Sequence, residues 1–178
     1  MHFFSLVLLS LLLLPLSEVN TPHVDTALKY KNVKEKTGHN DGPEVEMFLK
    51  SVNGHKGDSW CSAFVSYCMT VTHVKNPSFR TALAQGYITK QSIKANDVLI
   101  GKVKIKRGDL VIYKRGQTIF GHIGISTGDW SNRCGPTIEG NTSGNAGSQY
   151  DGEGVYEKVR YIQPASAFRI VYFTRVSY

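Results

Sequence analysis

Apolar residues recur at helical spacing in the N-terminal half of the chain. Val45, Phe48, Leu49 and Val52 stand at positions i, i+3, i+4 and i+7. Asp41 precedes Pro43, and an aspartate in that place can cap the free N–H groups of a first helical turn. The pattern therefore predicts an amphipathic helix that begins near Asp41 and buries one face.

A second helix is expected from about residue 60 to residue 73, with Ser59 as its cap. Its buried stripe consists of Phe64, Val65, Cys68 and Val71 or Thr72. Cys61 stands at the start of that stripe, in the first turn of the helix. Weaker helical patterns cover residues 24–34 and 79–86.

From Gly108 onward, apolar and polar residues alternate with a period of two. Segments 109–114, 121–127, 137–139, 155–160 and 168–174 are expected to be strands separated by glycine-containing turns. Helices followed by such strands predict an α+β fold, with the N-terminal helices packed on an antiparallel sheet of about five strands. A chain of 178 residues suffices for one hydrophobic core, so we expect residues 18–178 to form a single domain.

An apolar run precedes this domain. Between Phe3 and Leu14 only Ser5 and Ser10 are polar, and Pro15 ends the run. A membrane-spanning helix needs about 20 apolar residues, so the shorter run is more typical of a secretory signal. We expect residues 1–17 to be a signal peptide and the protein to be secreted, periplasmic or in the cell envelope, without stable membrane insertion. An uncleaved anchor or a buried first helix is the alternative.

The formal net charge of +7 lies wholly outside residues 1–17, which contain no charged side chain. Such a surface favours polyanions. The densest basic run contains Lys102, Lys104, Lys106 and Arg107. A solvated strand edge explains the alternating lysines equally well. No recognition-helix, zinc-ligand or RNA-binding aromatic motif accompanies them, so no nucleic-acid partner is expected.

Three cysteines, Cys61, Cys68 and Cys134, are too few for a disulfide framework and show no Cys-x-x-Cys spacing. Either Cys68 is a core residue, which we favour, or it pairs with Cys134; in both cases Cys61 stays free. No histidine or carboxylate spacing supports a metal site, and no cofactor is expected.

Cys61 and His122 together suggest thiol chemistry. The first turn of a helix offers a positive dipole end and unpaired N–H groups, which favour a thiolate and can hold an oxyanion. His122 shares one strand face with Gly124 and Ser126, whereas Ile123 and Ile125 share the other. The remaining histidines lack such a setting and are expected at the surface. A buried structural cysteine and a histidine bonded to a carbonyl are the alternatives.

Glu139 and Asn141 are two residues apart, so on an extended strand both side chains point to one side. A carboxylate beside His122 would fix its tautomer, and an amide could orient the ring or polarise a carbonyl. Asn141 also begins the glycosylation sequon Asn-Thr-Ser and lies in a segment whose composition is typical of turns.

These motifs together resemble the CHAP family of cysteine amidohydrolases and peptidases. The likeness lies in Asp58–Cys68, Gly108–Tyr113, Gly121–Ile125 and Ile138–Asn141, and extends from about Gly42 to Tyr172. The resemblance implies a papain-like fold in which Cys61 is the nucleophile, His122 the base, Glu139 its orienting group and Asn141 an assistant. Some phage lysins of the family bind calcium through several aspartates, whereas here only Asp58 is present.

Members of that family cut peptidoglycan at the muramoyl–alanine amide or within its peptides. The resemblance therefore implies an exported, monomeric peptidoglycan hydrolase, with Trp60 and Ser62 beside Cys61 contacting the substrate. A catalytically silent wall-binding module and a secreted antibacterial effector are the alternatives; a basic nucleic-acid binder ranks last.

Overall fold

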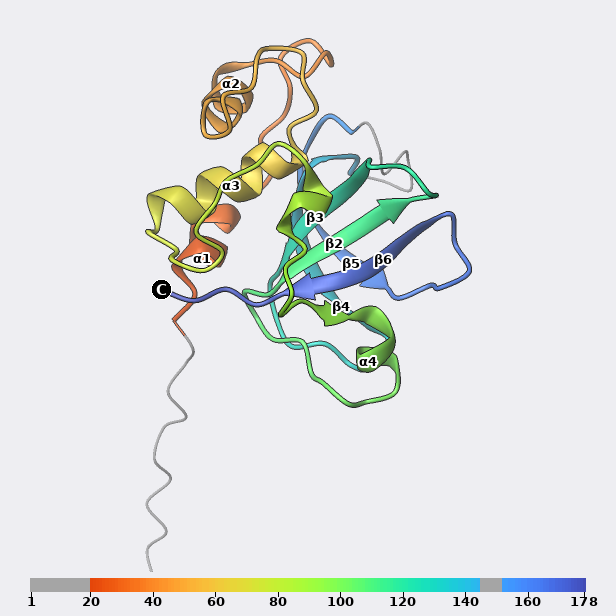
Figure 1. The fold of residues 1–178 in the computed structure, drawn as a ribbon. Coiled ribbons are helices and arrows are strands. Elements are labelled where there is room, and N and C mark those ends of the chain that lie inside the picture. The colour runs from red at the N-terminus through yellow and green to blue at the C-terminus, as the bar shows by residue number, and fades with distance from the viewer. Residues whose placement is uncertain (1–19, 145–151) are drawn as a thin grey trace, which may run out of the picture.

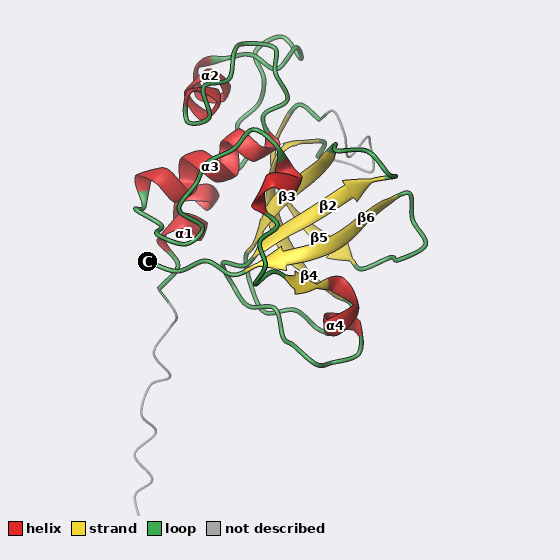
Figure 2. Cartoon of the chain, in the orientation of Figure 1, coloured by secondary structure: helices red, strands yellow, loops and turns green. Residues whose placement is uncertain are grey.

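The computed structural model describes residues 20–144 and 152–178, so the predicted signal peptide lies outside the described residues. Figure 1 shows one sheet with α1, α2 and α3 grouped beside it and with α4 apart from these three helices. Figure 2 distinguishes helices from strands by colour. The helices are α1 (Pro22–Lys29), α2 (Pro43–Lys50), α3 (Cys61–Val71), α4 (Ala95–Leu99) and a 3-10 turn, η1 (Ala84–Tyr87). The strands are β1 (Ile93–Lys94), β2 (Leu110–Arg115), β3 (Gly121–Ser126), β4 (Cys134–Thr142), β5 (Gly154–Tyr161) and β6 (Phe168–Thr174).

The six strands form one antiparallel sheet in the order β1-β6-β2-β3-β4-β5. The predicted α+β class is confirmed. The expected number of strands was low by one because β1 is only two residues long, which is too short for any alternation to show. It forms by pairing Ile93 with Phe173 of β6.

The sheet is covered on both faces, and the alternation along β2 shows how. Leu110 and Ile112 belong to one cluster of buried side chains, which includes those of α1, α2 and α3 and is here called the helix-face core. Val111 and Tyr113 belong to a second cluster with Ala95 and Val98 of α4, here called the back-face core. Alternate residues of one strand thus serve two cores.

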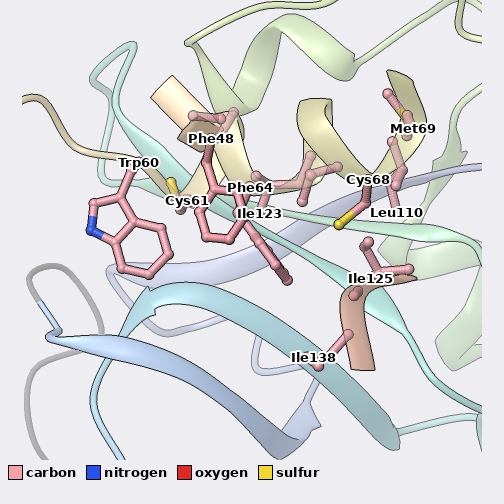
Figure 3. Close-up of a cluster of buried hydrophobic side chains, with 14 of the residues drawn as sticks. Phe48, Trp60, Cys61, Phe64, Cys68, Met69, Leu110, Ile123, Ile125 and Ile138 are labelled. Atoms are coloured by element: carbon pink, nitrogen blue, oxygen red, sulfur yellow. The ribbon is translucent and has the colours of Figure 1, made fainter. Parts of the chain in front are cut away.

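Helix α3 lies against the centre of the sheet, as Figure 3 shows for its buried side chains. The Phe48 ring of α2 stacks on Trp60 at a centroid distance of 5.9 Å and meets Phe64 edge-on at 5.2 Å. Cys68 is fully buried in the same core, where burial raises the pKa of its thiol. All three cysteines are free, so the core assignment of Cys68 is confirmed and the bridge to Cys134 is not formed.

Three local expectations are wrong. Ser59 does not cap α3: Trp60 occupies the cap position, and no side-chain hydrogen bond caps the first turn there. Asp41 does not cap α2: Gly42, with a φ of 119°, occupies the cap position, and Asp41 accepts the Thr37 N–H at 2.8 Å. A β-carbon at Gly42 would be strained in that conformation, so glycine enables the turn into the helix. The segment predicted as helix at 79–86 contains only the 3-10 turn η1.

The basic segment 102–107 is not a strand edge. It is a loop that joins α4 to β2, held by the buried side chain of Ile105. Next to it, His23 was expected at the surface but is buried. Its Nε2–H donates to the Gly108 carbonyl at 2.8 Å, and burial lowers the pKa of His23 to about 4.

We predict that Cys68→Ser lowers the free energy of unfolding by about 1–3 kcal/mol, because it places a hydroxyl in the apolar helix-face core. Cys134 is only half-buried, so Cys134→Ser is a matched control and should change stability by less than about 0.5 kcal/mol. Urea unfolding monitored by circular dichroism measures both. Equal losses in the two variants would contradict the core assignment.

Candidate active site

Cys61 is the first residue of α3 and lies at the junction of that helix with the sheet. The backbone N–H of Trp60, just before it, donates to the Asn141 side-chain oxygen at 3.1 Å, which ties the start of α3 to β4. The Cys61 side chain remains 8% exposed and lines an open pocket. Its sulfur is therefore at the positive end of the helix dipole and within reach of a ligand.

His122 is the second residue of β3, and its neighbours fix the direction of its ring. Ile123 and Ile125 are buried in the helix-face core, so His122 takes the opposite register. Its imidazole and the Cys61 thiol line the same pocket, and their interaction raises the pKa of His122. Its Nε2–H donates to Oε2 of Glu139 at 3.0 Å. The structure thus brings together the thiol, the imidazole and the carboxylate in the expected order.

Glu139 lies in β4 and is fully buried. Its carboxylate accepts hydrogen bonds from four side chains on four strands. Besides the imidazole, the donors are Tyr113 Oη at 2.9 Å, Thr137 Oγ1 at 2.8 Å, Arg160 Nε at 2.9 Å and Arg160 Nη2. A carboxylate has about four lone-pair positions, so this one is saturated. Its two oxygens are fixed, and they fix the imidazole in turn.

Arg160 and Tyr113 are site residues that the sequence did not reveal. Each lies on a different strand from Glu139, and both reach it across the back face of the sheet. Only the cross-strand register brings them together. In the sequence, Arg160 is the one arginine of the alternating segment that forms β5. An arginine in such a segment is expected at an exposed position, so the sequence offered no reason to place it in the site.

A glycine makes room for this arrangement. A β-carbon at Gly124 would lie 2.6 Å from Cγ of Glu139, closer than real contacts allow. Glu139 therefore rests directly on the backbone of β3 beside His122. Gly124, on the same strand face as His122, thus leaves the space that Glu139 occupies.

Burial disfavours the charged forms of both His122 and Glu139, yet their partners reverse the outcome. Burial alone would lower the pKa of His122, but its bonds to Cys61 and Glu139 outweigh burial and raise that pKa to about 9. Burial alone would raise the pKa of Glu139, but the bonds and charges of Arg160 and His122 hold it well below its usual range. At neutral pH the pair is an imidazolium and a carboxylate.

Asn141 lines the pocket with Cys61 and His122, but its side chain does not point the way that the two-residue spacing predicts. Its φ of 55° and a register irregularity in β4 break the alternation, so its side chain does not follow that of Glu139. Its amide N–H groups donate to Asn40 at 3.0 Å and to the Gly152 carbonyl at 3.1 Å. No hydrogen bond to His122 is present among the described residues. Asn141 instead anchors the start of α3, and its burial is incompatible with use as a glycosylation site.

Trp60 and Ser62 lie behind Cys61 rather than in the wall of its pocket. The fully buried Trp60 indole donates to Oε1 of Glu35 at 2.8 Å. The buried Ser62 hydroxyl donates to the Thr81 carbonyl at 2.8 Å. Their side chains support the start of α3, and neither is among the residues that line the pocket, so their contact with substrate stays a prediction.

The pocket beside Cys61 and His122 has a volume of about 130 Å³. Its rim is apolar: Leu83, Ile119 and Phe120 are 45%, 66% and 60% exposed. Ile119 and Phe120 stand in the turn between β2 and β3, next to Arg115. Exposed apolar side chains grouped around a reactive thiol are typical of a ligand-binding surface.

Within residues 20–144 and 152–178, no group of three histidine, cysteine or carboxylate side chains is placed to bind a metal ion. In the same residues, no helix is both long enough and apolar enough to cross a bilayer. Comparison with protein-family models, curated proteins and solved structures finds no match to this chain. The candidate site is therefore defined by its own geometry.

We predict that His122 titrates near pH 9 in the folded protein, against an ordinary value of 6.5. A folded-state pKa above the unfolded value means that protonated His122 stabilises the fold below pH 6.5 and that this contribution disappears as the pH rises through about 9. The ring resonances of His122, followed by NMR against pH, measure the midpoint.

Cys61→Ala removes one of the partners that raise this pKa, so the midpoint should fall. Cys134→Ser leaves both partners in place and should not move it. A midpoint near 6.5 in the unmodified protein would refute the ion-pair description.

Proposed function

We propose that this protein is a hydrolase that uses Cys61 as a covalent nucleophile. The observation that carries the proposal is that Cys61 and His122 line the same pocket and interact there, while the Glu139 carboxylate holds the His122 imidazole at 3.0 Å. A nucleophile, a base and a group that orients the base are the parts that acyl transfer requires.

In the proposed reaction, the Cys61 proton resides on His122 and the thiolate attacks an amide carbonyl. The N–H groups at the start of α3 stabilise the oxyanion of the tetrahedral intermediate. The imidazolium then donates its proton to the leaving amine as the C–N bond breaks, which leaves a thioester on Cys61. Water, deprotonated by His122, attacks the thioester carbonyl. The C–S bond then breaks, the acid is released, and the thiolate is again paired with the protonated imidazole.

We propose peptidoglycan as the substrate, cut at the muramoyl–alanine amide or in its peptides. The resemblance of four motifs to the CHAP family supports this choice, and the formal charge of +7 suits an anionic wall. The papain-like assignment rests on the same resemblance, together with a cysteine at a helix start facing a histidine on an antiparallel sheet. The proposal includes export directed by residues 1–17 and action as a monomer.

The direct test is digestion of purified peptidoglycan sacculi, with mass spectrometry of the soluble fragments. The unmodified protein should release fragments with a new amine terminus. Cys61→Ala should release none, because the nucleophile is gone, and His122→Ala should lower turnover by at least about 100-fold. The fragment masses identify the bond that is cut.

Cys134→Ser is the matched control, because it also removes a free thiol but lies away from the pocket. It should digest sacculi at the unmodified rate. Fragment release by Cys61→Ala equal to that of the unmodified protein would eliminate the thiol mechanism. Binding to sacculi without release by any form would favour the wall-binding module.

The apolar rim yields a separate prediction. Ile119→Ser should raise KM several-fold with little change in kcat, because the rim contacts the substrate equally in the ground and transition states. Ile100→Ser is the control: Ile100 is also 66% exposed but does not line the pocket. Steady-state kinetics on a soluble peptidoglycan fragment measure both. Equal KM values would show that the rim does not contact this substrate.

A further inference from the structure

A second cavity lies on the back face of the sheet and shares no lining residue with the active-site pocket. Its volume is about 110 Å³. Tyr113, Phe168 and Ile170 give it apolar walls, and Arg160, Tyr161 and Gln163 give it polar groups. Tyr113 and Arg160 are the same residues that hold Glu139, so this cavity lies directly behind the catalytic carboxylate.

The Arg160 side chain lines the cavity and keeps 10% of its surface exposed. Nε and Nη2 donate to Glu139, and Nη2 also reaches Thr142 Oγ1 at 3.4 Å. The guanidinium carbon lies 5.9 Å from the centre of the Tyr113 ring, which also lines the cavity. An arginine that lines a cavity and is partly exposed can bind an anion there.

The lining of the cavity favours an anion. Arg160 is the charged side chain among the described lining residues, and none of them is acidic. Lys158, on the same strand as Arg160, is a further basic residue nearby. A basic lining without a carboxylate suits one acidic ligand.

The apolar walls of the cavity favour a ligand with an apolar group next to its negative charge. The Tyr113 and Phe168 rings are stacked 5.1 Å apart and nearly parallel, at 8°, and Ile170 is buried beside them. Such a surface suits a short apolar group next to the charge. Gln163 at the rim offers an amide to a second polar atom.

We propose that the back-face cavity is a binding site for a small carboxylate, held by the partly exposed side chain of Arg160. The chemistry is that of a peptide C-terminus or a short organic acid. The ligand would be two hydrogen-bonded steps from His122, through Arg160 and Glu139. Occupancy of the cavity would therefore change the surroundings of the catalytic imidazole, and the two sites are coupled.

The test uses N-acetylalanine as the probe and the full chain labelled with ¹⁵N and ¹³C. Titration should shift the Nε–H resonance of Arg160 and the ring resonances of His122 in a saturable way, with one shared millimolar dissociation constant. N-acetylalanine methylamide has the same body without the charge and should produce no saturable shift. Acetate should bind more weakly if the site takes a peptide terminus, and equally well if it takes short organic acids.

A charge series at Gln163 provides matched variants, since this exposed side chain lines the cavity without contacting Glu139. Gln163→Glu should weaken binding of N-acetylalanine about tenfold or more, and Gln163→Lys should strengthen it, because each places a full charge next to the ligand. Equal affinity in all three forms, or equal shifts with the methylamide, would overturn the proposal. The measurement needs no hydrolysis, so it can fail or succeed independently of the proposed function.

Discussion

The buried carboxylate of Glu139 is the constraint on which the site depends. A charge with no exposure is tolerated only when hydrogen bonds and opposite charges surround it, and here the donors come from β2, β3, β4 and β5. Four neighbouring strands must therefore keep their register for one side chain to remain ionised. The orientation of His122 follows from the same requirement.

The Cys61 thiol is placed by the helix-face core. Phe48, Trp60 and Phe64 pack together at the start of α3, and a β-carbon at Gly140 would lie 2.7 Å from the Trp60 ring and 2.8 Å from Phe64. The helix therefore rests on the backbone of β4, one residue beyond Glu139. A single strand thus sets the position of both halves of the site, because it carries the carboxylate on one face and receives the helix on the other.

The sequence was sufficient for the parts of this arrangement that depend on local patterns. Helical spacing located α3 with Cys61 in its first turn, and alternation placed His122 opposite Ile123 and Ile125. The parts that depend on strand register could not be predicted, because no local pattern indicates that Arg160 and Tyr113 contact Glu139 across the sheet. The direction of the Asn141 side chain was predicted wrongly for a related reason: its left-handed backbone interrupts a strand that the two-residue spacing treats as regular.

The recess that holds the sulfur also determines what can reach it. Cys61 is only 8% exposed and lines a pocket of about 130 Å³. A broad, rigid surface therefore meets the exposed side chains of the rim before it meets the thiol. In the proposed hydrolase this shape would favour a slender, extended polymer over the amide bonds of a compact folded protein.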